Sequence, residues 1–336
     1  MEDWSKLIFS NEVSFQEKAR KVFDYQYEHT SVYRRYCEAL GIETKANSGS
    51  IADNSAISCP LLPIRAFKDA EITTQLDKKP NLVFKSSGTS AMQQSVHQVM
   101  DASIYKQSLF KGFGHFYELE SAVIWGYMPI YENNPHSSLI YMMQELILQD
   151  QSNLSRFLRL NEPLRAEKIK EVQESGKQLI LFGAAFGLLD LLEMKKVSLP
   201  SNSIVIETGG MKTNRREISR KELHRKLAKG FGLDSSRIHS EYGMAELLSQ
   251  AYATGSEWFH TVPWMKVSIR NPENPFEEVP AYSEGLIGII DLANVYSCSF
   301  LLTGDRGMMD KKGRFQVMGR WNPKDLRGCN FLIEED

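Results

Sequence analysis

Cysteine is scarce in this chain, with four residues in 336. Cys37, Cys59, Cys298 and Cys329 lie far apart and form no Cys-x-x-Cys pair, and the seven histidines show no spacing typical of a metal site. Structural zinc sites and disulfide frameworks both depend on such clusters. The sequence therefore argues against both and predicts a protein of a reducing compartment, the cytoplasm.

An excess of one charge is also lacking. Lys and Arg total 40, Asp and Glu total 42, and the formal net charge is −2. A nucleic-acid-binding surface needs a basic excess, so we expect no nucleic acid partner. No apolar run approaches the roughly 20 residues that span a bilayer, and the acidic start, Met1 to Lys6, is unlike a signal peptide. We therefore expect no membrane span.

Three familiar motifs are missing. The nearest approach to a Walker A loop, at 209–213, places Met211 between the glycine and the lysine. Residues 112–117 lack the third glycine of a dinucleotide fingerprint, and 183–187 have Ala185 at the nucleophile position of a Gly-x-Ser-x-Gly elbow. Hydride transfer and hydrolysis by a serine elbow both lose support.

Strand-like and helix-like segments alternate along most of the chain. Capping boxes at Ser14 and Ser219 open two of the predicted helices. From about residue 255, Pro, Gly and alternating segments predict antiparallel sheet or a small barrel. We expect an α/β fold of stacked, mostly parallel sheets with flanking helices. The strands are predicted near 81–84, 122–127, 178–182, 203–206, 237–241, 262–269 and 285–290, and the helices near 14–29, 101–118, 137–149, 165–174, 186–193 and 219–229.

The turn after the strand at 81–84 has the composition of a phosphate-binding loop. Hydroxyl and backbone N–H groups can hold one anion together, and a glycine lets the backbone approach it without a Cβ in the way. Such clusters are also common in plain surface turns, so this segment gains weight only from the motifs after it. The loop residues are Ser86, Ser87, Gly88, Thr89 and Ser90.

Two later turns can receive a nucleotide base. Like the phosphate-loop candidate, each follows a strand-like segment, where an open α/β sheet places its ligands. Gly209 and Gly210 can let a flat base lie against the backbone, and Tyr242, followed by Gly243, offers a ring for stacking.

Three charged residues supply the other parts of a nucleotide site. Glu246 can bind a divalent cation, Asp305 can accept hydrogen bonds from two ribose hydroxyls, and Arg320 can neutralise a phosphate. Each motif also has a structural alternative. Glu246 can simply begin a helix, and the Thr-Gly-Asp around Asp305 is common in ordinary turns.

These five motifs, in this order and spacing, resemble those of the adenylate-forming enzymes, the superfamily of acyl-CoA synthetases, luciferases and peptide-synthetase adenylation domains. Within it the chain most resembles the acyl-protein synthetase (LuxE) family, which supplies activated fatty acid to bacterial fatty-acid reductase systems. The similarity runs from residues 62–68 to the Arg-Gly-Cys at 327–329.

The resemblance implies an ATP- and Mg²⁺-dependent enzyme that activates a fatty acid, or another carboxylate, as an acyl-adenylate. It assigns the ATP phosphates to 86–90, the adenine to 209–210 with Tyr242 at its flank, and Mg²⁺ to Glu246. Asp305 would hold the ribose, and Arg320 would lie close to the ribose and α-phosphate. The small residues at 183–185 are candidates for the acyl pocket.

Cys329 matches the cysteine that accepts the acyl group as a thioester in the LuxE family, which implies an acyl reductase as a possible partner. Its alternative is an inert thiol on a frayed tail. Cys37, Cys59 and Cys298 are interpreted as small buried residues.

The sequence departs from its relatives at two places. Residues 91–94 carry no lysine after the phosphate loop, and we expect the protein to lack the mobile C-terminal domain of coenzyme A ligases. We expect an N-terminal helical segment at 1–80 packed on the main domain, an α/β core at 81–255, and a β-rich region at 256–336 that completes the nucleotide site and carries Cys329. Two alternatives stay open: a short acyl- or aryl-CoA ligase, and an inactive nucleotide- or acyl-binding regulatory subunit.

Overall fold

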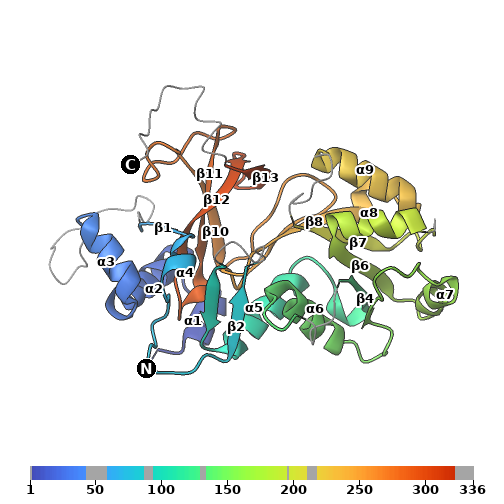
Figure 1. Ribbon diagram of the computed structural model, residues 1–336, viewed down its shortest axis with the longest axis horizontal. Helices are drawn as coiled ribbons and strands as arrows, with labels where there is room; N and C mark the ends of the chain where they lie inside the picture. Colours follow the sequence, from blue (N-terminus) through green and yellow to red (C-terminus); the bar gives the residue numbers. More distant parts are fainter. Residues whose placement is uncertain are drawn as a thin grey trace.

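The computed structural model of the protein describes residues 2–42, 59–86, 94–128, 134–194, 197–209 and 218–321. The helices are α1 (Trp4–Phe9), α2 (Phe15–His29), α3 (Ser31–Ala39), α4 (Ala66–Asp69), α5 (Ala102–Gly114), α6 (Ser138–Leu148), α7 (Ala166–Glu174), α8 (Ala185–Met194) and α9 (Arg220–Phe231), with short 3₁₀ helices η1 (Leu119–Ser121), η3 (Ser235–Arg237) and η4 (Leu292–Asn294) (Figure 1). The strands are β1 (Leu62–Pro63), β2 (Leu82–Lys85), β3 (Val96–Val99), β4 (Ala122–Tyr127), β5 (Arg156–Phe157), β6 (Gln178–Ala184), β7 (Ile204–Thr208), β8 (Ile238–Tyr242), β9 (Ala251–Ala253), β10 (Met265–Arg270), β11 (Glu284–Asp291), β12 (Phe300–Met309) and β13 (Phe315–Arg320).

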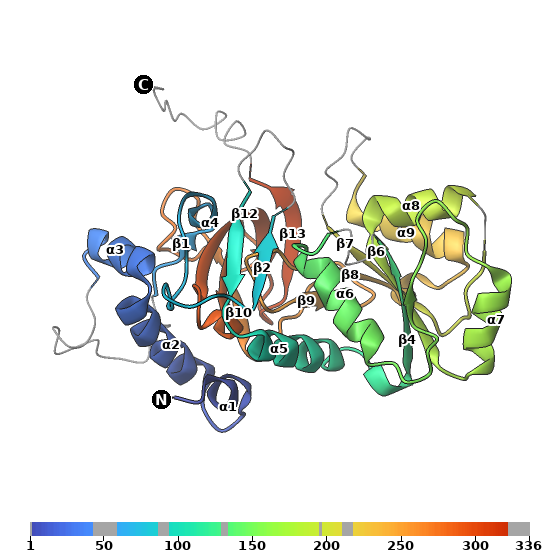
Figure 2. The same ribbon diagram turned by 60° about the horizontal axis from the view of Figure 1, so that its bottom comes forward.

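A six-stranded sheet forms the larger α/β layer, in the order β5-β4-β6-β7-β8-β9. All neighbours in it are parallel except β8 and β9. Every residue of β4, β7 and β8 is buried, as expected for parallel strands covered on both faces. Helices α7, α8 and α9 pack on one face and α5 and α6 on the other (Figures 1 and 2). The predicted α/β fold is confirmed.

Successive residues of β4 show how the sheet divides two cores. Val123 and Trp125 pack with α7, α8 and α9, whereas Ile124 packs with α5 and α6. Because side chains alternate between the faces of a strand, an unbroken apolar run supplies both cores at once.

A second sheet has the order β1-β12-β11-β10, with β13 also paired to β12. Its pairs are antiparallel except β1 with β12, where Leu62 lies opposite Leu301. Of the two alternatives for this region, the antiparallel sheet is the one found, and its described strands do not close into a barrel. Helices α1, α2 and α3 contribute to the same core as this sheet.

The third sheet is the two-stranded antiparallel hairpin of β2 and β3, in which Phe84 lies opposite His97. The phosphate-loop candidate connects these two strands. We expected it to follow a strand of the open α/β sheet, and this expectation is wrong, because β2 hydrogen-bonds only to β3 among the described strands. Its buried Phe84 packs edge-on to Tyr105 of α5, with ring centroids 5.5 Å apart.

Helix starts agree with the predicted caps. The Ser14 and Ser219 hydroxyls accept hydrogen bonds from the backbone N–H groups of Glu17 and Glu222, each at 3.2 Å. Asp101 caps α5 through the N–H of Ser103 at 2.8 Å. These contacts satisfy N–H groups that the first helical turn leaves without a partner. None of the helices in the described ranges combines the length and apolar character needed to cross a bilayer.

Candidate functional site

Asp305 lies at the centre of a polar cluster between the parallel and antiparallel sheets. The Tyr242 hydroxyl donates to Asp305 Oδ2 at 2.8 Å, and Arg320 Nε lies 3.0 Å from Asp305 Oδ1. Tyr242 is the last residue of β8, while Asp305 and Arg320 lie opposite each other on β12 and β13. The structure thus brings together three of the predicted site residues from sequence positions far apart.

The position of Asp305 corrects one sequence-based interpretation. We considered that Asp305 could be an ordinary turn residue, but it lies inside the ten-residue strand β12. The Thr303 hydroxyl accepts from the Asp305 N–H at 3.1 Å and donates to the carbonyl of Ile287 on β11 at 2.8 Å. Asp305 is therefore fixed through its backbone and through both carboxylate oxygens.

Burial differs sharply across this cluster. Tyr242 and Asp305 are buried, whereas the Arg320 side chain is 56% exposed. Burial, and then the charge of Asp305, raise the pKa of Tyr242 well above its usual value, so the hydroxyl keeps its proton. Apart from Nε, the Arg320 guanidinium makes no hydrogen bond to another described residue. It can therefore face an anionic ligand.

The ring of Tyr242 contributes to the core. It packs edge-on to Phe259 and Phe315, with ring centroids 6.0 Å and 5.7 Å apart. The sequence suggested a ring that stacks on a base, and it gave no sign of the hydroxyl contact to Asp305. That contact joins residues 63 positions apart.

Two acidic residues at the carboxyl edge of the parallel sheet were not predicted as site residues. Glu241 of β8 lies opposite Thr208 of β7, whose hydroxyl donates to the Glu241 carboxylate in a short hydrogen bond. Burial, and to a smaller extent the charge of Glu207, raise the pKa of Glu241 to about 7. A Cβ on Gly243 would lie 2.4 Å from Glu241 Oε1, so the Glu241 carboxyl needs a glycine at 243.

Glu207 of β7 is paired with two bases of α9. Its Oε1 lies 3.2 Å from Arg220 Nε and 3.5 Å from His224 Nε2, and it accepts a hydrogen bond from Ser240. Burial alone would raise the pKa of Glu207, but His224, Arg220 and Ser240 together lower it. Arg220 also donates to the carbonyl of Val317 at 3.1 Å. It thereby ties β13, which ends at Arg320, to the parallel sheet.

Gly209 directly follows β7, at the same edge of the sheet as Tyr242. Its φ of +84° lies in the left-handed region that favours glycine, and no atom of a described residue lies within 4 Å of the place a Cβ would take. Gly210 lies outside the described residues. The backbone thus requires a glycine here, and no described residue fills the space beside it.

Glu246 lies in the irregular segment that connects β8 with β9. The alternative in which it begins a helix is wrong, since no helix follows it. Asp291 holds the later part of this segment by accepting from the N–H groups of Leu248 and Ser249 at 2.8 Å and 2.9 Å. Burial raises the pKa of Asp291 to about 6.

The Glu246 carboxylate fits one part of a magnesium site. It is buried and makes no hydrogen bond or ion pair to another described residue. No three His, Cys, Asp or Glu side chains in the described ranges gather closely enough to hold a metal by themselves. Proteins often bind Mg²⁺ through one or two carboxylates together with substrate phosphates, and a single available carboxylate suits that arrangement.

Ser86 is the one residue of the phosphate-loop candidate that the structure describes; Ser87, Gly88, Thr89 and Ser90 lie outside. Its hydroxyl accepts from the Ser95 N–H at 2.9 Å, and its own N–H donates to the Ser95 carbonyl at 3.1 Å. Ser86 and Ser95 therefore extend the pairing of the hairpin by one residue pair beyond β2 and β3. No described residue accepts the hydroxyl hydrogen of Ser86, which can therefore be donated to a ligand.

Two predicted features remain, the acyl pocket at 183–185 and the acceptor cysteine Cys329. At the acyl-pocket candidate, a Cβ on Gly183 would come within 3.0 Å of Leu188 Cδ2 and 3.2 Å of the Tyr127 carbonyl, so close packing by itself accounts for this glycine. Cys329 lies outside the described residues, and its role stays a prediction.

Solved structures with a similar fold are adenylate-forming enzymes. One is 2-hydroxyisobutyryl-CoA ligase in complex with 2-HIB-AMP and CoA, with a TM-score of 0.61 and 14% identity over 92% of this chain and 68% of that one. Another is ATP-bound MatB from Rhodopseudomonas palustris, with a TM-score of 0.53 and 16% identity over 72% of this chain and 49% of that one. The chain thus spans about half the length of MatB.

Comparison with curated proteins found no significant match. The sequence does match the family model "Acyl-protein synthetase, LuxE" over residues 146–336. This match spans more than half of the chain and includes Tyr242, Glu246, Asp305 and Arg320. The protein therefore belongs to the acyl-protein synthetase (LuxE) family.

Proposed function

We propose that this protein uses ATP to activate a carboxylic acid as an acyl-adenylate. The main support is the Asp305 carboxylate, which Tyr242 and Arg320 hold beside the carboxyl edge of the parallel sheet. Each of its oxygens keeps a lone pair for a hydrogen bond from a ribose hydroxyl. Membership of the LuxE family supports the same reaction and favours a fatty acid as the substrate.

In the proposed first step, a carboxylate oxygen attacks the α-phosphorus of ATP. A new O–P bond forms, the bond from the α-phosphorus to the bridging oxygen breaks, and pyrophosphate leaves with the electron pair. An anion attacks a polyanion here, so positive charge near the α-phosphate lowers the barrier. Arg320 is suited to supply it, since its guanidinium is largely exposed. Glu246 would hold Mg²⁺, which when bound neutralises phosphate charge.

In the proposed second step, the Cys329 sulfur attacks the acyl carbon. A C–S bond forms, the bond from the acyl carbon to the phosphate oxygen breaks, and AMP leaves. The thiolate is the reactive form of cysteine. Burial raises the pKa of Cys37 to about 12 and also raises the pKa values of Cys59 and Cys298. These three thiols are therefore unsuited, which favours Cys329.

The thioester would then be delivered to an acyl reductase in the cytoplasm. This part of the proposal rests on the family alone. A pull-down with acylated and unacylated protein tests it, because a delivery partner should discriminate between the two.

The decisive assay is carboxylate-dependent exchange of labelled pyrophosphate into ATP, measured across a panel of carboxylic acids. Adenylation predicts exchange with at least one fatty acid. Absence of exchange with every acid would instead favour the regulatory subunit. Glu246→Gln should abolish exchange by weakening Mg²⁺ binding, and full activity in that variant would remove the metal assignment.

Labelling with a radioactive fatty acid separates thioester formation from coenzyme A ligation. Cys329→Ser should keep pyrophosphate exchange but lose stable acyl labelling, whereas Cys298→Ala, the matched change at a buried thiol, should keep both. Labelling that persists in Cys329→Ser would refute the thioester step. Formation of acyl-CoA by both variants would favour the short CoA ligase.

A further inference from the structure

Two buried side chains hold two consecutive backbone carbonyls, those of Ala245 and Glu246. His97 Nδ1 lies 2.8 Å from the carbonyl oxygen of Ala245, and Asn294 Nδ2 donates to the carbonyl oxygen of Glu246 at 2.8 Å. His97 comes from β3, in the hairpin that carries the phosphate-loop candidate, and Asn294 from η4, after β11 of the antiparallel sheet. Two separate parts of the fold therefore meet at this segment.

These contacts determine that the other polar atoms of the two side chains, His97 Nε2 and Asn294 Oδ1, are hydrogen-bond acceptors. A carbonyl oxygen only accepts, so His97 Nδ1 must carry a hydrogen. Burial lowers the pKa of His97 to about 4, which keeps the ring neutral and makes Nε2 an acceptor. The Asn294 amide nitrogen faces Glu246, so its Oδ1 points the other way and is also an acceptor.

Neither acceptor has a partner among the described atoms. His97 Nε2 and Asn294 Oδ1 are both buried and without a hydrogen bond, and both residues are fully buried. Buried polar atoms almost always have a partner, so this coincidence of two needs an explanation.

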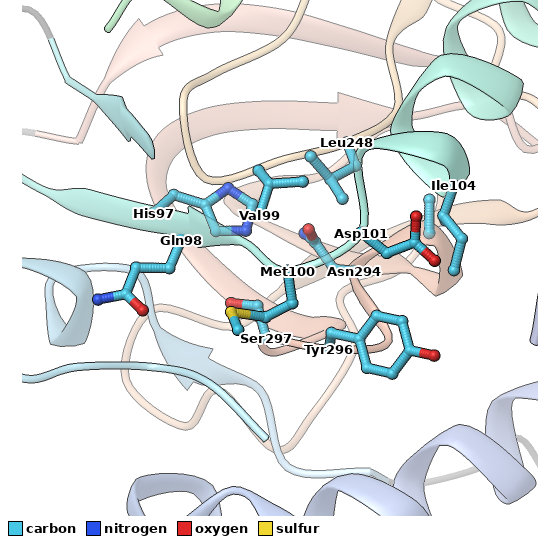
Figure 3. Close-up of a pocket in the computed structure, with 11 residues that line it drawn as sticks. His97, Gln98, Val99, Met100, Asp101, Ile104, Leu248, Asn294, Tyr296 and Ser297 are labelled. Carbon is cyan, nitrogen blue, oxygen red and sulfur yellow. The ribbon is translucent and has the colours of Figure 1, made fainter. Parts of the chain in front are cut away.

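Both residues line the same small cavity, whose volume is about 10 Å³. In Figure 3 the His97 ring and the Asn294 amide point toward one another across it, with Val99 and Leu248 beside them. Two acceptors cannot bond to each other. A molecule with two O–H donors satisfies both, and the volume is close to what a single water needs.

We propose that one buried water donates to His97 Nε2 and Asn294 Oδ1, and that this bridged pair positions the Glu246 segment against the hairpin of the phosphate loop. His97 and Asn294 are positioning residues, since they contact the backbone beside Glu246 and would act through it. The water follows from the hydrogen-bonding pattern and the cavity and does not depend on the proposed function; the role in metal binding rests on that function.

The bridge explains why two neutral polar side chains are buried at this point. A water that bonds to both clamps β3 and η4 together, and with them the two consecutive carbonyls at 245 and 246. Partners that orient a ligand, without touching the metal, commonly set metal affinity. A rigid segment would hold the Glu246 carboxylate in one place before ATP and Mg²⁺ arrive.

The wild-type protein provides the first test. A high-resolution crystal structure should show an ordered water about 3 Å from both His97 Nε2 and Asn294 Oδ1. Nitrogen-15 NMR should find His97 as the neutral tautomer with hydrogen on Nδ1. A dry cavity, a direct hydrogen bond between the two side chains, or the tautomer with hydrogen on Nε2 would each overturn the bridge.

Variants test the positioning role. His97→Phe removes both ring nitrogens and should raise the Mg²⁺ concentration for half-maximal pyrophosphate exchange about tenfold or more, with the rate largely recovered at saturating Mg²⁺. His97→Asn, whose amide can still reach Ala245, should recover part of that loss. The matched control is His136→Phe, because His136 Nδ1 contacts the Val83 carbonyl of the same hairpin at 3.0 Å but is exposed. It should keep the wild-type Mg²⁺ dependence.

An unchanged Mg²⁺ dependence in a folded His97→Phe variant refutes the positioning role, as does an equal change in His136→Phe. Calorimetric titration of Mg²⁺–ATP gives the same comparison without turnover. If the wild-type protein exchanges no pyrophosphate with any acid, the proposed function fails, and the water and the tautomer then decide this inference by themselves.

Discussion

Tyr242→Phe separates two roles of one side chain, since it removes the hydroxyl that donates to Asp305 and leaves the ring. The ring packs edge-on to Phe259 and Phe315, and a phenylalanine keeps that packing. If Tyr242 acts only as an aromatic ring beside a base, the variant should behave like the wild type. If its hydroxyl fixes Asp305, both stability and ATP binding should suffer.

The expected loss follows from the type of bond. A hydrogen bond to a charged group contributes about 1.5–3 kcal/mol, and Asp305 is buried, so its Oδ2 would be left without a donor among the described residues. We expect the free energy of unfolding to fall by about 2 kcal/mol. If about 1.4 kcal/mol is also lost in ordering Asp305 against ribose, the KM for ATP rises about tenfold.

Urea denaturation measures the first quantity, and pyrophosphate exchange at varied ATP measures the second. The matched control is Tyr252→Phe. Tyr252 is fully buried on the neighbouring strand β9, but its hydroxyl has no hydrogen-bond partner among the described residues. Its removal should leave the KM unchanged and leave stability equal or slightly higher.

The reasoning would be refuted by a Tyr242→Phe variant with wild-type stability and wild-type KM. It would also be refuted if Tyr252→Phe destabilised the protein as much as Tyr242→Phe. A loss of stability with an unchanged KM would keep the hydrogen bond and remove its link to ATP.

Three further variants probe the same region. Burial raises the pKa of Glu241 to about 7, so its protonated form stabilises the fold fully below pH 4.5, and this contribution is lost as pH rises through 7. The free energy of unfolding of Glu241→Gln, measured relative to that of the wild type, should therefore rise by about 3 kcal/mol over that window. A constant difference between the two proteins would contradict this. Gly243→Ala places a Cβ 2.4 Å from Glu241 Oε1 and should lower the unfolding free energy by about 1–3 kcal/mol. A variant with the same melting temperature as the wild type would show that the Glu241 carboxyl moves aside without cost. Arg320→Ala removes the exposed partner of the buried Asp305 carboxylate, so the free energy of unfolding should fall by about 1–3 kcal/mol, while exchange should fall at least about tenfold if Arg320 meets a phosphate; unchanged exchange would remove that role.

The parallel sheet could be predicted from the sequence because its strands are continuous apolar runs bounded by helix caps. Residues 122–127 and 203–206 each fill both faces of the sheet, and the capping boxes at Ser14 and Ser219 mark helix starts. These signals are local, so they survive without knowledge of the fold.

The parts that could not be predicted depend on distant partners. The Thr-Gly-Asp around Asp305 left an ordinary turn open as an alternative, yet Asp305 lies inside β12, where Gly307 is also needed because a Cβ would lie 2.5 Å from the Gln316 carbonyl. Strand β3 was missed because His97 and Gln98 interrupt its apolar residues, and His97 is buried in contacts with Ala245 and Phe67, which are distant in sequence. The sequence identified Tyr242, Asp305 and Arg320 separately, but only the fold shows that they touch.

Strand β1 can pair with β12 only after the later part of the chain has been synthesised. Leu62 pairs with Leu301, and Gln26 of α2 donates to the carbonyls of Asn294 and Val295. At about 5–20 residues per second on the ribosome, α2 waits on the order of 15–50 seconds for the strand region that covers it. During that interval its apolar face, which includes Val22 and Phe23, is open to aggregation or to a chaperone. Synthesis speed, as well as sequence, should therefore influence how much active protein a cell obtains.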